Sequence, residues 1–511
     1  MDLNKIKKIH FVGIGGIGVS AVAKMMLQLG KTITGSNLSE SIVTQDLEKL
    51  GVKIFYQHQA DNVTSDVDLL IYSPAVPDDN SERMRARELR IPELSYPEFL
   101  GEFSKDKFTV AISGTNGKST TTAILGLILE QTNLDPTVIV GSRLSQWNGN
   151  LRLGYSKYFV VEACEWRAHM LNLSPQIIIL TNLEEDHLDY YRDLNNIITT
   201  FQQYVDKLNP DDLLILNNDD DNLKKLKTHS RVLTYGVTQS ADIMATNIET
   251  GPGYQQFDLI SDKFKIKITL IIKVPGLFNI YNFLAAIAGA LALGASVESI
   301  NKVARSFTGI WRRFEVNDLK IVRSSSRADP RSPKGMSRRN LKLEIVSDYA
   351  HHPTAVKDTI KAAQEFFPGR RVVAVFQPHH HNRTKRLFNE LVDSFQGADL
   401  VIISEIYDVV GREESDDQNI SSLDLVQAIK AKHSAESAEA SISLIPNIKK
   451  TLGYKICDFL RNGWRRRTKY PQQEIFYTPD LSQTKQKLLS LAQPNDVVLI
   501  MGAGDIYTLF D

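Results

Sequence analysis

The stretch SGTNGKSTTT, residues 113–122, constrains the fold of this chain more than any other. It follows an apolar, β-branched run, KFTVAIS, and opens a helical pattern, STTTAILGLILEQ. An anion cradle at a helix N-terminus needs small residues that expose backbone N–H groups, a lysine that neutralises charge, and a hydroxyl that can hold Mg²⁺. Gly114, Gly117, Lys118 and Ser119 provide these groups. The stretch therefore predicts a phosphate-binding loop between a strand and a helix.

One position departs from the usual G-x-x-x-x-G-K-[ST] pattern, because Ile112 stands where the first glycine is expected. The change shortens the loop without removing any group that would contact phosphate. A glycine turn followed by an incidental lysine is the simpler alternative. The strand before the turn and the helix after it favour the phosphate-binding loop.

A second glycine-rich turn, FVGIGGIGVS, matches G-x-G-x-x-G from Gly13 to Gly18, after a strand and before a helix. On its own the pattern favours NAD or FAD. A dinucleotide site also needs an acidic residue at the end of the second strand to hold a ribose, and Asn37 stands there. Since any diphosphate can lie on such a helix N-terminus, the turn predicts a diphosphate site.

With 511 residues the chain is too long for one hydrophobic core, and three domains are expected. Strand and helix patterns alternate in each third, which indicates parallel sheets. Boundaries are expected near residue 104 and near SFTGIWRRFEV, giving domains of residues 1–103, 104–309 and 310–511. The predicted fold class is α/β, with a Rossmann-like N-terminal domain, a central mononucleotide-binding domain and a Rossmann-like C-terminal domain. The strands are expected in KIHFVG, KTITGS, VDLLIYS, KFTVAIS, KYFVVEA, PQIIILTNL, DDLLILNND, LEIVSDYAHHP, RRVVAVFQP, ADLVIISEIYD and NDVVLIMGAGD.

Composition excludes several classes of protein. Lysine plus arginine and aspartate plus glutamate balance at 60 each, which argues against a nucleic-acid partner. The two cysteines cannot build a disulfide framework, so a cytoplasmic location is expected. The longest apolar run, residues 283–297, is too short to span a bilayer and predicts a buried helix. Two basic, turn-rich segments, residues 324–340 and 461–473, are interpreted as solvated loops.

The phosphate-binding loop needs metal ligands at the ends of neighbouring strands. FVVEACEW ends a strand at Glu162, and IIILTNLEEDHLDYY places His187 just past another strand end. A lone histidine is more often structural than a ligand, but the acidic residues around His187 favour a metal ligand.

The last third carries two histidine-rich turns, DYAHHPT and FQPHHHNRT, each after a strand. They contain five of the eleven histidines: His351, His352, His379, His380 and His381. A zinc site is an open alternative. It is ranked lower because no cysteine or acidic residue has ligand spacing with them.

These stretches, in this order and over nearly the whole chain, resemble the Mur ligase family of ATP-dependent enzymes that join amino acids to a UDP-sugar carboxylate in bacterial cell-wall synthesis. The resemblance rests on HFVGIGGIGVS, SGTNGKSTTT, TNLEEDHLDYY, WRRFE, DYAHHPT, FQPHHHNRT and MGAGDIY. Within the family, the chain is most similar to members that join L-alanine to UDP-N-acetylmuramate. The resemblance implies that the first domain holds the UDP-sugar, the central domain holds MgATP, and the third brings the amino acid.

The resemblance also implies a role for particular residues. The ATP site is expected to contain Gly114, Thr115, Asn116, Gly117, Lys118, Ser119, Thr120, Asn279, Arg313 and Asp348. The UDP-sugar site is expected to contain Gly13, Gly15, Gly16, Ile17, Gly18, Ser36, Asn37 and Ser73. Ser119, Glu162 and His187 are the expected Mg²⁺ ligands, and the expected catalytic residues are Lys118, Glu162, His187, Arg313, His379 and Arg383.

The chain departs from the family pattern at several positions. Cys164, Trp166 and Arg167 follow Glu162 where the family commonly has acidic residues, Asn37 replaces a frequent aspartate, and His380 stands where an arginine is usual. Residues 188–206 contain no lysine, so no carbamylated lysine is expected there.

Three other functions remain open. A recycling ligase would attach a whole peptide to the same sugar, although the GIGGIG turn favours the single-amino-acid enzyme. A nicotinamide-dependent oxidoreductase would leave Lys118, Glu162 and His187 unexplained. A nucleotide-gated binding protein without ligase chemistry is the third. A monomer and a homodimer are both compatible with the sequence.

Overall fold

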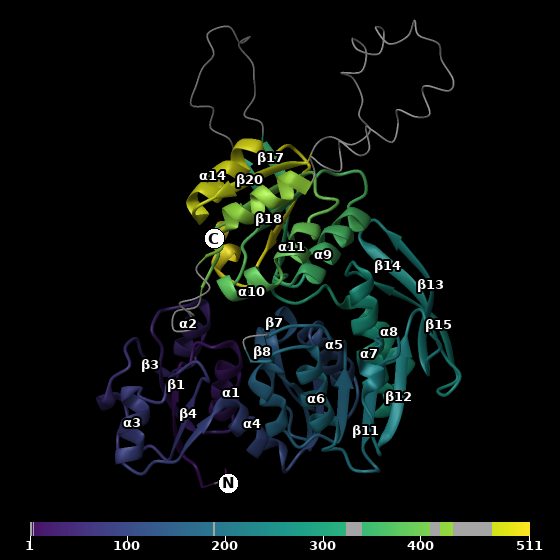
Figure 1. Cartoon of the computed structure of the whole chain (residues 1–511). Coiled ribbons are helices and arrows are strands. Elements are labelled where there is room, and N and C mark those ends of the chain that lie inside the picture. Colours follow the sequence, from purple (N-terminus) through teal and green to yellow (C-terminus); the bar gives the residue numbers. More distant parts are fainter. Residues whose placement is uncertain are drawn as a thin grey trace, which may run out of the picture. The chain divides into compact units, whose positions relative to one another are not determined.

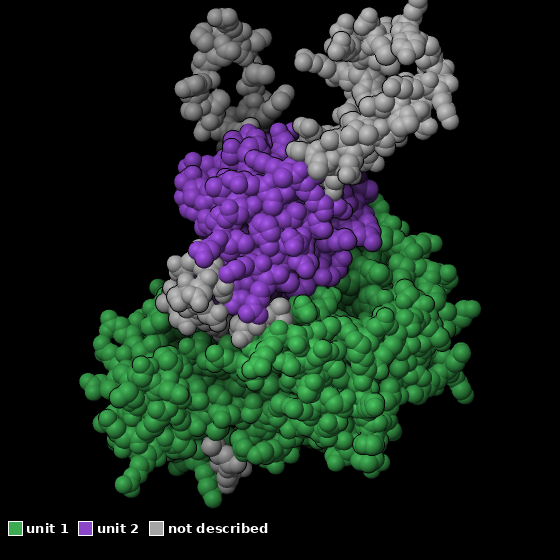
Figure 2. Space-filling model, viewed as in Figure 1, with its two compact units in different colours: residues 1–311 green, residues 312–511 purple. Residues whose placement is uncertain are grey.

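The computed structural model describes residues 3, 5–187, 190–322, 340–408, 419–432 and 473–510. Nearly all of the two basic segments, residues 324–339 and 461–472, therefore lies outside the described residues. The chain divides into two compact units, residues 1–311 and 312–511 (Figure 2). Three sheets run through these units, two in the first and one in the second (Figure 1).

The first sheet is entirely parallel, with strand order β3-β2-β1-β4-β5. Its strands are β1 (Lys8–Val12), β2 (Thr32–Ser36), β3 (Lys53–Phe55), β4 (Leu69–Tyr72) and β5 (Glu93–Ser95). The helices between them are α1 (Ile17–Gln28), α2 (Ile42–Lys49), α3 (Ser81–Glu88) and α4 (Tyr96–Ser104). The order reverses between β1 and β4, and such a switch point opens a crevice at the carboxyl ends of the strands. The first glycine turn follows β1 and lies at this crevice.

The second sheet has ten strands in the order β15-β14-β13-β12-β11-β10-β6-β9-β7-β8. They are β6 (Phe108–Ser113), β7 (Thr137–Leu144), β8 (Gly149–Arg152), β9 (Tyr158–Glu162), β10 (Ile177–Leu180), β11 (Leu213–Asn217), β12 (Arg231–Gly236), β13 (Ile243–Gly251), β14 (Tyr254–Ser261) and β15 (Ile266–Ile272). The central strands are parallel, as the sequence predicts. The pairs β13–β14, β14–β15 and β7–β8 are antiparallel and extend the sheet at both edges.

Strand β6 shows why the central strands read as continuous apolar runs. Val110 and Ile112 pack into a core with α5 (Lys118–Glu130) and α7 (Leu277–Ala292), while Ala111 faces a core on the opposite side. That second core also contains side chains of the first sheet, such as Phe11, and of α4 and α6 (Leu194–Val205). Both faces of the central sheet are therefore covered, and the first two sheets share one core.

The third sheet has the order β16-β17-β21-β18-β19-β20 and is parallel except for the edge pair β16–β17. Its strands are β16 (Glu315–Val322), β17 (Asn340–Asp348), β18 (Val372–Phe376), β19 (Leu400–Ser404), β20 (Glu474–Thr478) and β21 (Val497–Met501). Helices α9 (Pro353–Phe366), α10 (His381–Arg386), α11 (Phe388–Asp393) and α14 (Leu481–Leu491) connect them. The α/β class with three sheets is thus confirmed.

The apolar run at residues 283–297 lies mostly in α7, and most of its side chains are buried. It is a core helix, as expected. Among the described residues, no helix has both the length and the apolar character that crossing a bilayer requires.

Phe159 tests the shared core. It is the second residue of β9, is 0 % exposed, and meets the ring of Phe103 from α4 edge to face, with centroids 5.0 Å apart. Phe159→Ala should lower the free energy of unfolding by about 3–5 kcal/mol, because it leaves a cavity between α4 and the sheet. Tyr155→Ala, at a residue 85 % exposed, is the control and should change stability little. Equal denaturation midpoints for the two variants would contradict the shared core.

Candidate active site

The phosphate-binding loop, residues 114–117, joins β6 to the N-terminus of α5. Gly117 caps the helix with a φ of 86°, and a Cβ there would collide with Oδ1 of Asn282 in α7. Only glycine meets both demands. Ile112, which occupies the missing-glycine position, lies inside β6 with its side chain in the core. The loop is short because the strand continues through that position.

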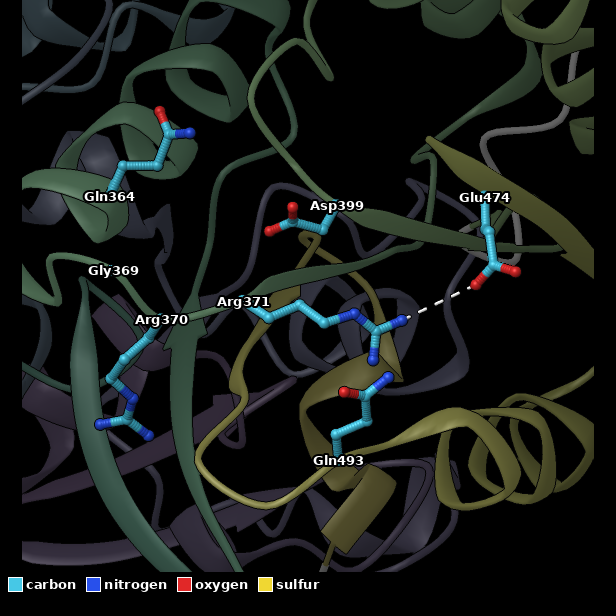
Figure 3. A pocket seen from close by; sticks show the side chains of 7 residues that line it. All are labelled: Gln364, Gly369, Arg370, Arg371, Asp399, Glu474 and Gln493. Atoms are coloured by element: carbon cyan, nitrogen blue, oxygen red, sulfur yellow. Dashed lines mark ion pairs between the residues drawn. The ribbon is translucent and has the colours of Figure 1, made fainter. Parts of the chain in front are cut away.

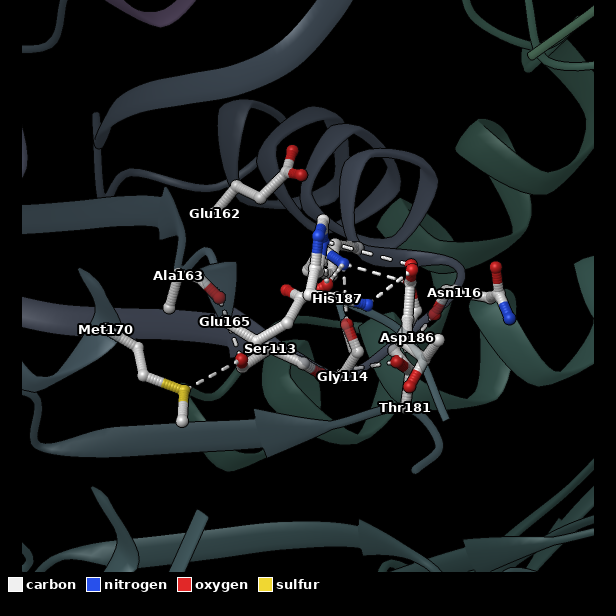
Figure 4. A network of polar contacts seen from close by, with 12 residues as sticks. Ser113, Gly114, Asn116, Glu162, Ala163, Glu165, Met170, Thr181, Asp186 and His187 are labelled. Carbon is white, nitrogen blue, oxygen red and sulfur yellow. Dashed lines mark hydrogen bonds and ion pairs between the residues drawn. The ribbon is translucent and has the colours of Figure 1, made fainter. Parts of the chain in front are cut away.

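The loop is tied to the end of the neighbouring strand β10. Thr115 donates its N–H to the carbonyl of Asn182 (3.0 Å), and Asn116 donates its N–H to Oδ1 of the same residue (2.9 Å). The Thr181 hydroxyl donates to the carbonyl of Asn116 (2.6 Å), so loop and strand end form one hydrogen-bonded body (Figure 4). These bonds fix the loop backbone before any anion arrives, and they occupy the N–H groups of Thr115 and Asn116.

Lys118 is held at the first turn of α5. Its Nζ donates to the carbonyls of Gly114 (2.6 Å) and Thr115 (2.9 Å) and pairs with Oε1 of Glu165 (2.9 Å). Burial alone would lower the pKa of Lys118, but the charges of Glu165 and Glu162 outweigh burial and raise it. The lysine is therefore charged and directed at the loop.

Glu165 belongs to the site although the sequence motifs do not indicate it. Its side chain is 7 % exposed, and Oε1 also lies 3.6 Å from Nε2 of His187. Burial would raise the pKa of Glu165, but Lys118 and His187 lower it, so the group is ionised. Its second oxygen, Oε2, is buried without a hydrogen-bond partner in the described part of the chain. A buried, ionised oxygen of this kind is a natural ligand for a cation.

The expected metal ligands fall into two groups. Ser119 donates its hydroxyl to Oε2 of Glu162 (2.8 Å), which also accepts the N–H of Gly141 (2.8 Å). His187 lies instead with Glu165 and Asp186, and one ligand atom from each of these three lies within 4.8 Å of the others. Oxygen ligands of this kind suit Mg²⁺, so the residues present fit the expected ion.

The backbone near this site is unusual. Arg167, Ala168 and His187 have φ values of 49°, 56° and 51°, in the left-handed region that non-glycine residues rarely adopt. Each such residue costs energy that the surrounding structure must offset, and such residues cluster at functional sites. The unusual backbone therefore lies where the chain has to place the side chains of Glu165 and His187.

The residues expected at the UDP-sugar gather at the carboxyl ends of β1, β2 and β4. The N–H groups of Gly13 and Ile14 both donate to the carbonyl of Ser36 (2.9 and 3.0 Å). Ser73, after β4, donates its N–H to Val12 (2.9 Å), and its Cβ would lie 3.0 Å from a Cβ at Gly13. Gly18 packs so closely against Tyr96 that a Cβ would lie 2.7 Å from the tyrosine oxygen.

Asn279, expected at the adenine, lies near the start of α7. It is buried, donates Nδ2 to the carbonyl of Pro275 (2.7 Å) and accepts from Asn282 (3.2 Å). Asn282 in turn lies against Gly117. Asn279 is thus linked to the phosphate-binding loop through the side chain of Asn282.

In the second unit, Asp348 ends β17 and is buried. Its two oxygens accept the N–H groups of Phe314 and Ala350, both at 2.7 Å, and burial raises its pKa. Arg312 donates to the carbonyls of Gly502 and Gly504, so it holds the glycine loop of MGAGDIY. Arg313, the arginine expected at ATP, lies over the ring of Tyr349.

His379 and Arg383 are also brought together, with His379 Nδ1 and Arg383 Nη1 3.5 Å apart. The ring of His379 stacks on Tyr407, and His381 pairs with Asp408. Among the described residues, the five histidines of these turns belong to no group of three converging ligand atoms, so the zinc alternative finds no support.

A pocket in the second unit lies elsewhere. Figure 3 shows its lining residues, Gln364, Gly369, Arg370, Arg371, Asp399, Glu474 and Gln493. Several of them lie just before β18 and β19 or are the first residue of β20, which places them at the amino ends of the strands. Asp348 and His379 lie at the carboxyl ends, on the opposite side of the sheet. Arg371 pairs with Glu474 (3.7 Å) across the pocket. The expected site residues are therefore not at this pocket.

The fold and the loop define a nucleotide-binding α/β protein of three domains. Three family models match the chain: the Mur ligase family catalytic domain at residues 8–108, the Mur ligase middle domain at 112–290, and the Mur ligase glutamate ligase domain at 336–504. The chain belongs to the Mur ligase family, whose members depend on ATP.

Individual relatives agree over the full length. The chain is 36 % identical over 513 aligned residues to a UDP-N-acetylmuramate–L-alanine ligase of Acetivibrio thermocellus, covering 99 % of this chain and 95 % of that protein. The crystal structure of a UDP-N-acetylmuramate–alanine ligase from Thermotoga maritima matches with a TM-score of 0.73 and 27 % identity, covering 98 % of this chain and 97 % of that one. A murein peptide ligase from Psychrobacter arcticus shares the fold, with a TM-score of 0.65 and 22 % identity over 99 % and 97 % of the two chains.

Glu165→Gln tests the pairing with Lys118. The substitution keeps the shape but removes the charge that orients Lys118 and His187. Since misplacement of a reacting group by about 1 Å costs about 100-fold in rate, kcat for phosphate release from ATP should fall at least tenfold. Glu185→Gln, in the same acidic cluster but exposed, should stay within about twofold. Circular dichroism at the assay temperature shows that each variant is folded, and parental turnover in Glu165→Gln would contradict the assignment.

Proposed function

We propose that the chain is an ATP-dependent ligase that joins L-alanine to the carboxylate of UDP-N-acetylmuramate in the synthesis of peptidoglycan precursors. The observation that carries the proposal is the preorganised loop with Lys118 buried between carboxylates, in a chain that matches alanine-adding relatives over its whole length. A cytoplasmic enzyme with domains of residues 1–103, 104–309 and 310–511 fits this function.

The chemistry explains why such a loop is needed. A carboxylate is a poor electrophile, so transfer of the γ-phosphoryl group of ATP first makes an acyl phosphate, which the amine of the amino acid then attacks with loss of phosphate. Lys118 and the loop N–H groups stabilise charge on the transferred group. Ser119 and Glu162 would hold Mg²⁺, which supplies further charge neutralisation when bound. Glu165, Asp186 and His187 form a second set of ligand atoms for a cation.

The remaining expected residues serve the substrates. Arg313 and Asp348 are proposed to contact ATP, and His379 and Arg383 to contact the amino acid or the sugar carboxylate. His380 follows His379 where a relative would have an arginine, and a guanidinium grips a carboxylate with two hydrogen bonds where an imidazole gives one. Carboxylate recognition by this chain would then depend more on Arg383.

A panel of acceptors tests the proposal. Phosphate release should be measured with ATP, Mg²⁺ and UDP-N-acetylmuramate against single amino acids and against the cell-wall tripeptide. L-Alanine should give the highest kcat/KM. Highest turnover with the tripeptide would establish the recycling ligase instead. If none of the acceptors gave phosphate release, the result would support a binding protein.

Lys118→Ala should abolish ligation. Because it leaves the carboxylate of Glu165 without its partner, it should also lower the free energy of unfolding by about 3–5 kcal/mol, with the chain still folded at the assay temperature. The lysine neutralises the transferring phosphoryl group, and its Nζ already lies against two carbonyls of the loop that would hold that group. Product formation should be followed by chromatography, and folding by circular dichroism. Lys105→Ala, on an exposed helix end, is the matched control and should be fully active. Near-normal ligation by Lys118→Ala would overturn the nucleotide assignment.

His187→Ala separates a metal ligand from a packing residue. Since Mg²⁺ prefers oxygen, one imidazole should add little to MgATP affinity but should position the cation during acyl transfer. The variant should bind MgATP within about threefold of the parent in calorimetry yet lose most of its turnover. Unchanged turnover across a Mg²⁺ titration would make His187 structural.

A further inference from the structure

Glu82, in α3, is a fully buried carboxylate near the carboxyl end of β2. Its Oε2 lies 2.5 Å from the Ser36 hydroxyl and 3.3 Å from Nδ1 of His58, and its Oε1 lies 2.5 Å from Nδ2 of Asn62. Nε2 of His10, at 3.8 Å, is too distant for a hydrogen bond. Burial would raise the pKa of Glu82, but His10, His58, Ser36 and Asn62 together outweigh burial and lower it to about 2. Glu82 is therefore charged at neutral pH and can only accept hydrogen bonds.

The charge of Glu82 fixes the direction of the neighbouring hydrogen bonds. Because Glu82 cannot donate, the Ser36 hydroxyl must donate to it. The Ser36 oxygen then accepts from Nδ1 of His58, 2.8 Å away. Nδ1 of His58 thus carries a proton, and Nε2 is the ring nitrogen on the side away from Ser36. In a serine nucleophile the hydroxyl donates to histidine, so the order seen here excludes Ser36 as a nucleophile.

This network lies beside the first glycine turn. The carbonyl of Ser36 accepts both N–H groups that open the turn, from Gly13 and Ile14. His58 follows β3, which pairs with β2 in parallel, so His58 and Ser36 lie past neighbouring strand ends. The His58 side chain is 17 % exposed. The imidazole is therefore partly open to solvent.

In dinucleotide-binding folds a side-chain acceptor at the end of the second strand binds a ribose hydroxyl. Asn37 stands at that position, but its side chain serves the turn. Its Oδ1 accepts the N–H of Gly15 (3.2 Å), and its Nδ2 donates to the carbonyl of Ser39 (2.8 Å). The Asn37 amide packs so closely that a Cβ at Gly15 would lie 2.7 Å from it. Both polar atoms of the Asn37 side chain are thus engaged within the protein, whereas His58 lies against Ser36, the residue before it.

We propose that His58 accepts a hydrogen bond from a ribose hydroxyl of the uridine nucleotide through Nε2, and that Glu82 and Ser36 position the ring for this contact. The inference rests on the proposed function, which places a UDP-sugar in the first domain. His58 is thus a specificity-determining residue for the nucleotide, and Glu82 is a positioning residue.

Asparagine and glutamine separate the two nitrogens of His58. The amide of asparagine falls near Nδ1, so His58→Asn keeps the inner hydrogen bond to Ser36 but removes the outer acceptor. The amide of glutamine reaches Nε2, so His58→Gln retains an outer acceptor. Gln59→Asn, at the exposed neighbour, is the matched control.

The probes are UDP, 2′-deoxy-UDP and 3′-deoxy-UDP, titrated into the full chain by calorimetry. One of the two deoxynucleotides should bind the parent about three- to tenfold more weakly than UDP, which is the loss of one neutral hydrogen bond. His58→Asn should bind UDP more weakly by the same factor and should no longer distinguish UDP from that deoxynucleotide. His58→Gln should retain part of the discrimination, and Gln59→Asn all of it.

Two results would overturn the inference. The first is a parent protein that binds all three nucleotides equally, which needs no variant to fold. The second is His58→Asn with undiminished discrimination. A parent protein that binds no UDP would instead count against the proposed function.

The tautomer of the His58 imidazole tests the positioning role of Glu82 separately from nucleotide binding. ¹⁵N chemical shifts of the histidine rings should show His58 of the parent in the Nδ1–H form, and Glu82→Gln should shift it toward a mixture, because a glutamine amide can also donate to Ser36. An Nε2–H form in the parent would refute the positioning role of Glu82.

Discussion

A buried charge must be paired, and the ion pair between Lys118 and Glu165 is where this constraint governs the molecule. The loop requires a cation next to its N–H groups, yet that cation is buried by the strand ends around it. Leaving one partner of a buried pair alone costs several kcal/mol, so the carboxylate has to be supplied by a neighbouring strand end. The segment after β9 provides it, and two consecutive left-handed residues, Arg167 and Ala168, follow after one further residue.

The parallel sheet makes such pairing practicable. All parallel strands end on the same edge, so β6, β9 and β10 deliver the loop, Glu162 with Glu165, and the acidic turn of His187 to one place. Covering both faces of the sheet keeps these strands from shifting in register. The first sheet has the same geometry, since the carboxyl ends of β1, β2 and β3 bring the glycine turn, Ser36 and His58 together. In each sheet one buried carboxylate holds the neighbouring polar groups in place: Glu165 pairs with Lys118, and Glu82 accepts from Ser36.

Much of this arrangement could be predicted from local sequence. The strand, loop and helix around Gly117 and Lys118 follow from short-range patterns, as do most of the central parallel strands of the three sheets. The parallel strands β3, β5, β7, β12 and β20 are not predicted. Local sequence does not predict the meander of β13 to β15, although the alternating side chains of YQQFDLIS in β14 are visible in the sequence. Alternation identifies a strand, but it does not reveal which sheet edge the strand extends.

Glu165 and Glu82 could not be found in this way, for a physical reason. Glu165 precedes Arg167 and Ala168, which adopt left-handed backbone without glycine, and no propensity indicates such a turn. Glu82 meets Ser36, 46 residues away, only when β2, β3 and α3 have packed. Its role follows from charge and burial together, since an ionised acceptor dictates where each neighbouring proton lies. The glycine turn alone is compatible with several nucleotides, and the side chains that fold against it narrow the choice. With the Asn37 amide held by the turn itself, the proposed contact to the ribose falls to His58, because the buried charge of Glu82 orients the Ser36 hydroxyl and, through it, the imidazole.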